Sequence, residues 1–418
     1  MSDRKRLIEH GKTALIVLLI ISAVLLVRQS GYYTTIPAVF APNVSQRPGS
    51  ETSDAASSQP ARPMRVVVSS EENVRYASEY DQSAVSSVYG SFSAAFGEAL
   101  GSASEPTETT EADFRRCLTG VGVTLDFYYP KQLGILAVQL GTASGAAGEH
   151  FARFVSLECS GENAVLYFLD STSGVYYRCS TGVVSSTILS KMDAYRQNNA
   201  VFAFENEKYS AIFPYTVILE TLPEIYALTA SGYSEAAFPL DELFSLLGMN
   251  TYVMRQYAES DGTIVYVESG KTLRIRSDGS ISFKQPSASA QQQDVSELIS
   301  QATQLLSRTL GVFAGSAEIN LSGVTVSSPE RLSLSYDYCV DGIPVRLDGG
   351  AHAASVAVSG GTITKLELHP RRYTLTADTL PVLPMEQACA IASAQGGGEP
   401  MLSYADRGSS TDCIWVIG

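Results

Sequence analysis

The chain carries one long uncharged apolar run near its N-terminus, Thr13 to Val27, bounded by Lys12 and Arg28. As a helix, this run would cover roughly 22 Å, which is shorter than the ~30 Å hydrocarbon core of a bilayer. The two basic side chains can extend to the membrane surface, and Tyr32 and Tyr33 can lie at the outer interface. The sequence therefore predicts a single transmembrane helix over residues 13–30.

The flanking charges predict the orientation of this helix. Four basic and two acidic residues precede Thr13, and such a positive bias keeps a segment in the cytoplasm. A cleaved signal peptide is the alternative, but the nearest small-x-small motif, Val39-Phe40-Ala41, lies far beyond the apolar run. No cysteine of the lipoprotein type follows the run. We therefore expect an uncleaved anchor in the cell membrane, with a cytoplasmic N-terminus and extracellular C-terminal domains.

Small residues within the apolar run indicate where another membrane helix could contact it. Ala14, Ser22 and Ala23 are the candidates, and Ala14 and Ser22 fall on roughly one helix face. Small side chains allow two helices to approach closely in a bilayer. We therefore take these three residues as a hypothetical membrane-helix interface.

The part of the chain beyond Arg28 is strongly acidic. The first 28 residues hold five of the 29 basic and two of the 43 acidic residues, which leaves a net charge of −17 on the rest. Such a surface repels nucleic acid, so we exclude a nucleic-acid partner. With 22 Tyr and 15 Phe in the chain, the outer part has ample apolar material for folded cores.

No residue pattern indicates catalysis, a cofactor or a metal. Gly270-Lys271-Thr272 matches the end of a phosphate-binding loop, but Val265 replaces the required glycine and the following residues alternate as a strand. His150, His352 and His369 stand alone in the sequence, which favours ordinary surface or half-buried histidines. The aromatic runs at 127–129 and 176–177 favour core strands over a binding surface. We therefore expect a non-enzymatic protein without cofactors.

The six cysteines show no metal-ligand spacing. Cys159 and Cys179 lie at the ends of two expected strands and are candidates for a disulfide outside the cell. Buried free thiols are the alternative, and the one that we favour.

Turn-rich segments and hydrophobic periodicity predict an α+β fold in which antiparallel sheets are backed by helices, within a multi-domain ectodomain. Helices are expected at 81–100, 114–118, 185–197, 240–247, 294–311 and 385–394. Strands are expected at 64–68, 121–128, 151–159, 164–169, 175–179, 332–339, 344–347, 353–358, 363–368 and 412–417, with a hairpin array over 262–285. The predicted organisation is a tail (1–12), the membrane helix (13–30), a Ser/Pro-rich linker (31–63) and three domains (64–200, 201–286 and 294–418).

Three stretches resemble the YycH family. The first is Gly122 to Gly141, a strand with an aromatic-proline turn before a small apolar helix. The second is Leu243-Phe244-Ser245 followed by Asp261-Gly262, Tyr266, Leu273, Ile275, Gly279 and Pro286. The third is Gly342 to Val345 followed by Ala353 to Val358 and Gly360-Gly361, which resembles a portion shared with the smaller YycI.

This resemblance implies a function without catalytic residues. YycH and YycI are extracytoplasmic regulators of the cell-wall two-component system of low-GC Gram-positive bacteria. The expected partners are therefore a sensor histidine kinase, a YycI-like single-pass membrane protein and the lipid bilayer. Two other classes stay open: a protease inhibitor or folding assistant, and a scaffold that binds cell-wall polymer.

Overall fold

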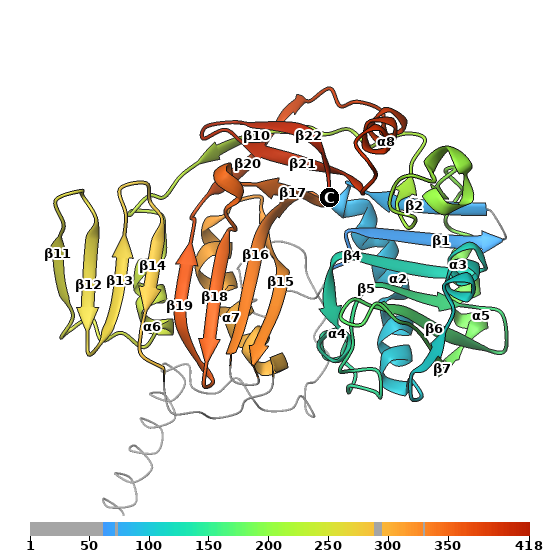
Figure 1. The fold of residues 1–418 in the computed structure, drawn as a ribbon, viewed down its shortest axis with the longest axis horizontal. Helices are drawn as coiled ribbons and strands as arrows, with labels where there is room; N and C mark the ends of the chain where they lie inside the picture. Colours follow the sequence, from blue (N-terminus) through green and yellow to red (C-terminus); the bar gives the residue numbers. More distant parts are fainter. Residues whose placement is uncertain (1–61, 72–73, 288–294, 329–330) are drawn as a thin grey trace, which may run out of the picture. The chain divides into compact units, whose positions relative to one another are not determined.

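The computed structural model describes residues 62–71, 74–287, 295–328 and 331–418 (Figure 1). The predicted membrane helix and its candidate contact residues Ala14, Ser22 and Ala23 lie outside this range, so their prediction stays untested. Within the described part of the chain, no helix is both long and apolar enough to cross a membrane. The described residues form an α+β fold of largely antiparallel sheets, as the sequence predicts.

The first sheet is entirely antiparallel, in the order β2-β1-β4-β5-β6-β7-β3. Its strands are β1 (Arg65–Glu71), β2 (Val74–Glu79), β3 (Thr107–Thr109), β4 (Gly122–Gln132), β5 (Phe151–Glu158), β6 (Asn163–Asp170) and β7 (Tyr176–Val184). Its helices are α2 (Gln82–Ser102), α3 (Glu111–Thr119), α4 (Leu133–Gln139) and α5 (Ser185–Met192). The helix predicted to reach residue 197 thus ends at Met192.

Successive side chains of β1 enter different cores, because side chains alternate across a strand. Val66 and Val68 pack with α2, whose first turn is capped by the Asp81 carboxylate accepting from Ala84 N at 2.8 Å. Val67 packs in a second core on the other face, which α3, the segment 200–219 and α8 (Met385–Ala394) cover. The sheet is therefore buried on both faces.

The second sheet has eleven strands in the described chain, in the order β11-β12-β13-β14-β19-β18-β16-β17-β21-β22, with β15 also paired to β16. These strands are β11 (Arg255–Ala258), β12 (Ile264–Glu268), β13 (Lys271–Ile275), β14 (Ile281–Lys284), β15 (Glu318–Ser328), β16 (Arg331–Val340), β17 (Ile343–Arg346), β18 (Ala354–Ser359), β19 (Thr362–Leu368), β21 (Pro400–Asp406) and β22 (Thr411–Ile417). The β17–β21 pair is parallel. The predicted hairpin array forms β12 to β14.

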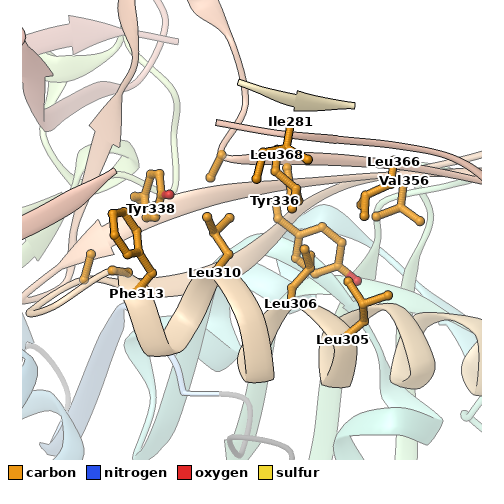
Figure 2. Packing of buried hydrophobic residues seen from close by; sticks show 14 of the residues in the cluster. Ile281, Leu305, Leu306, Leu310, Phe313, Tyr336, Tyr338, Val356, Leu366 and Leu368 are labelled. Carbon is orange, nitrogen blue, oxygen red and sulfur yellow. The ribbon is translucent and has the colours of Figure 1, made fainter. Parts of the chain in front are cut away.

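One apolar face of this sheet packs on helix α7 (Val295–Leu306), which continues as a short π-helix, Ser307–Gly311. Leu305, Leu306 and Leu310 point from this helix toward Tyr336 and Leu366 of the sheet (Figure 2). Helix α6 (Leu240–Leu246) adds Leu243 and Phe244 to the same core.

The remaining elements are short connections. The strand β10 (Tyr226–Ser231) pairs with β20 (Arg372–Thr379), and β8 (Val201–Phe202) pairs with β9 (Val217–Ile218). Three 3-10 helices complete the described elements, namely Ala203–Glu205, Glu207–Tyr209 and Asp348–Gly350.

The predicted middle and C-terminal domains contribute to one continuous sheet. Strand β14 pairs with β19 from Ile281↔Leu368 to Lys284↔Lys365. The division into two domains at residues 286–294 stays a prediction. The hydrogen bonding of the second sheet is continuous between the strands of these two predicted domains.

We expect Leu366→Ala to lower the free energy of unfolding by about 2–5 kcal/mol, because Leu366 is fully buried between the sheet and α7. Leu375→Ala is the matched control, since Leu375 is 40% exposed on β20; its effect should stay within about 0.5 kcal/mol. Urea denaturation of the chain from residue 56 onward measures both. Equal shifts in the two variants would contradict this description of the core.

Candidate functional site

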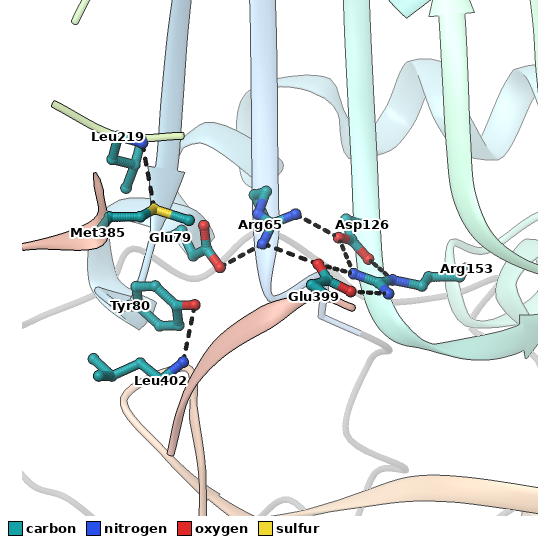
Figure 3. A network of polar contacts seen from close by, with 9 residues as sticks. All are labelled: Arg65, Glu79, Tyr80, Asp126, Arg153, Leu219, Met385, Glu399 and Leu402. Carbon is teal, nitrogen blue, oxygen red and sulfur yellow. Dashed lines mark hydrogen bonds and ion pairs between the residues drawn. The ribbon is translucent and has the colours of Figure 1, made fainter. Parts of the chain in front are cut away.

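The most unusual feature of the described chain is a buried cluster of charged side chains where the two sheets meet (Figure 3). Arg65 lies on β1 and is only 2% exposed. Its Nη1 donates to Asp126 Oδ2 of β4 at 2.9 Å, and its Nη2 donates to Glu79 Oε1 of β2 at 2.6 Å. The strand register explains why these three charged side chains lie side by side, because Arg65 is paired with Glu79 on one side and with Asp126 on the other.

Arg153 of β5 connects these charged side chains to the second sheet. It donates from Nε and Nη2 to the two oxygens of Asp126, at 2.8 and 2.9 Å. It also donates from Nη1 and Nη2 to the two oxygens of Glu399, at 2.6 and 2.8 Å. Glu399 immediately precedes β21. One guanidinium therefore binds a carboxylate from each sheet through two hydrogen bonds, the strongest geometry for such pairs.

Aromatic rings restrict Arg153 further. Its guanidinium carbon lies 4.6 Å from the centroid of Phe154 and 5.5 Å from that of Phe213. These distances are within the range of cation–π attraction. The side chain is thus fixed both by its carboxylate partners and by its neighbours.

The cluster holds three carboxylates and two guanidinium groups, so one negative charge is in excess. Burial raises the pKa of Glu79, although the positive charge of Arg65 opposes that shift. Burial alone would lower the pKa of Arg65, but the Glu79 and Asp126 carboxylates outweigh it and raise that pKa. In the fold the Glu79 carboxylate is therefore protonated more readily than an ordinary glutamate.

Neighbouring polar contacts reinforce the same junction. Leu402 N of β21 donates to Tyr80 Oη at 3.3 Å, and the Tyr80 ring lies edge-on to Trp415 of β22. Gln82 N donates to Asp341 Oδ1 at 2.8 Å, beyond the end of β16. The start of helix α2 is therefore tied to the second sheet as well.

The histidines are less isolated than their sequence positions indicate. His352 Nδ1 lies 2.8 Å from Asp337 Oδ1, and His369 Nδ1 lies 2.8 Å from the carbonyl oxygen of His352. Tyr129 Oη donates to the other Asp337 oxygen at 3.3 Å. His352 is exposed and His150 and His369 are partly buried, as predicted for surface or half-buried histidines, and strand pairing brings β16 and the residues before β18 together.

The structural interpretation of Gly270-Lys271-Thr272 is confirmed. Gly270 turns the β12–β13 hairpin with a φ of 85°, and Lys271 Nζ donates to the carbonyl oxygens of Leu247 and Gly248. A phosphate-binding loop would precede a helix, whereas Lys271 begins a strand.

Of the remaining candidates, Cys159, Cys179, Phe127 and Tyr177 belong to the cores. Cys159 and Cys179 are buried free thiols, so the disulfide is not formed, and burial raises their pKa values to about 11 and about 12. Phe127 is buried, and Tyr177 stacks on Phe168. Among the residues that the structure describes, no group of three or more His, Cys, Asp or Glu is placed to hold a metal.

Sequence reasoning missed every member of the charged cluster. Its five residues are distributed between positions 65 and 399; four lie in strands of ordinary pattern, and Glu399 follows three glycines. The available signal was weak: Arg65, Asp126 and Arg153 are charged residues within otherwise apolar strands. Only the register of β1, β4 and β5 shows that these charged side chains lie next to one another.

Comparison with known proteins identifies this arrangement of strands. No family model matches the chain, and no curated protein matches it. A solved structure does match: YycH from Bacillus subtilis, with a TM-score of 0.57 and 12% sequence identity, covering 88% of this chain and 95% of that chain. The chain has the YycH fold. At this identity the likeness to YycH concerns the fold, and it extends over nearly the whole of both chains.

We expect Arg153→Met to lower the free energy of unfolding by about 3–5 kcal/mol, because it leaves Asp126 and Glu399 buried without their main partner. Arg407→Met is the control, because its pair with Asp412 is exposed and such pairs contribute about 0–1 kcal/mol. Urea denaturation measures both variants. A similar small loss in each would show that the cluster does not stabilise the junction.

The raised pKa of Glu79 makes a further prediction about pH. Between its ordinary pKa of 4.5 and its raised value in the fold, the folded state binds the proton better than the unfolded state. The Glu79 contribution to stability therefore falls as pH rises through that window. We expect the stability of the original chain relative to Glu79→Gln to fall from pH 4 upward, measured by urea denaturation at several pH values. A difference that is constant with pH would contradict the shift.

Proposed function

We propose that this protein is a membrane-anchored extracytoplasmic regulator that modulates a sensor histidine kinase of a two-component system controlling cell-wall metabolism. It would act by contact, through its membrane helix and its outer domain, together with a YycI-like single-pass partner. The observation that carries the proposal is the YycH fold over 88% of the chain. The apolar run Thr13 to Val27 supports the anchor.

The position of the first described residues supports a coupling between anchor and outer domain. Arg62 pairs with Glu318 at the start of β15, and Met64 N donates to Asp126 O at 2.9 Å. Arg65 then enters the charged cluster. The chain that leads from the proposed anchor therefore joins the outer domain at β1, a strand next to the sheet edge that is bonded on both sides.

Such a regulator needs only a preference for one state of the kinase. A contact that favours one state by ~1–3 kcal/mol changes signalling by roughly 5- to 150-fold. Neither bound cofactor nor catalytic residue is required for this. The proposed transmembrane contact, through Ala14, Ser22 and Ala23, would supply part of that preference.

We expect replacement of Thr13–Val27 by a generic apolar anchor to reduce regulation, because the specific helix contact is lost while tethering is kept. We also expect residues 1–28 alone to retain some kinase binding. Co-purification from membranes measures binding, and a response-regulator reporter measures output.

Equal recovery and equal output from the original and the anchor-replaced chain would rule out a contribution from the helix. If the outer domain alone blocked or protected a secreted hydrolase while the reporter stayed unchanged, the protease-inhibitor or folding-assistant function would replace this proposal.

A further inference from the structure

A second feature, separate from the charged cluster, is a cavity of about 450 Å³. Its wall contains Tyr129 from β4, Asp337 from β16, Arg346 from β17 and Ser403 from β21. The segment from Gly350 to His352 closes one side. This volume is in the range of small-molecule sites. We propose that the cavity binds a small ligand through a single carboxylate group.

Arg346 is the group that would bind the carboxylate. Its side chain is exposed at the end of β17. In the part of the chain that the structure describes, no carboxylate lies within ion-pair distance of it. The planar guanidinium presents two parallel N–H donors that match a carboxylate. An exposed arginine in the wall of a cavity, with no carboxylate partner among the described residues, therefore points to an anionic ligand.

The acidic residue of the cavity does not compete for Arg346. Asp337 uses one oxygen for His352 at 2.8 Å and the other for Tyr129 at 3.3 Å. Both oxygens therefore have partners without Arg346. The same engagement makes Asp337 a poor ligand for a cation.

Two serine hydroxyls in the wall lack partners among the described residues. Ser403 is fully buried on β21, and its Oγ has no hydrogen bond; the same holds for Oγ of Ser322 on β15. Buried hydroxyls in proteins are nearly always hydrogen-bonded. Neither oxygen is accessible from the cavity, so Arg346 carries the proposed contact with the ligand.

The balance of charge selects the type of anion. Arg346 contributes one positive charge, and the Asp337 carboxylate contributes one negative charge. A doubly charged phosphate would therefore bring excess negative charge into the site, whereas a monocarboxylate leaves the smaller excess. A free organic acid and the C-terminus of a short peptide both carry this group.

The test is isothermal titration calorimetry of the full chain in detergent micelles with four probes: acetate, N-acetyl-Ala-Ala, the amide of that dipeptide, and inorganic phosphate. Arg346→Gln removes the proposed charge contact. Arg255→Gln is the matched control, because Arg255 is also an exposed arginine but lies on β11 at the far edge of the second sheet. Thermal melting verifies that both variants fold.

We expect saturable binding of at least one carboxylate, at least tenfold weaker in Arg346→Gln and unchanged in Arg255→Gln. Stronger binding of the dipeptide than of acetate would assign a peptide C-terminus, and equal binding would assign a small free acid. The proposal is overturned if no carboxylate binds, if the amide or phosphate binds as tightly as the carboxylates, or if Arg346→Gln binds like the original chain.

Discussion

The junction between the two sheets depends on the paired charges around Arg153. Burying five charged side chains is costly unless each finds its partners, and here each arginine contacts two carboxylates within hydrogen-bond distance. That arrangement forms only if β1, β2, β4 and β5 all pair in their native register. A shift of one residue in any of these strands would direct a charge into an apolar core. The cluster thus fixes both the register of β1, β2, β4 and β5 and their attachment to β21.

Local elements could be predicted from the sequence where turn chemistry and periodicity agreed. The hairpins of β12 to β14 follow from alternating residues and from Gly270 and Gly279, which adopt φ values of 85° and 82° that glycine tolerates best. The start of α2 follows from the Asp81 cap. These signals need only a few neighbouring residues. The α+β class follows from their sum.

Other elements could not be predicted, because distant contacts determine them. Strand β21 is buried at every position and so shows no alternation, while most of β20 is exposed and polar. The β14–β19 pairing joins segments on either side of the Ser/Gln-rich stretch after Pro286, whose composition indicated a boundary. The charged cluster and the cavity near Arg346 are missed for the same reason, since their residues meet only when the sheets are assembled.

The route by which the chain enters the fold gives the charged cluster a role in the proposed function. Here the connection leads to β1, which is bonded to β2 and β4, and its first residue, Arg65, contacts both neighbours. Asp126 also accepts a hydrogen bond from Arg153, and Arg153 in turn donates to Glu399, the residue before β21. The segment that would follow the proposed anchor is thus bonded through β1 and the charged cluster to both sheets, which would suit the proposed regulator.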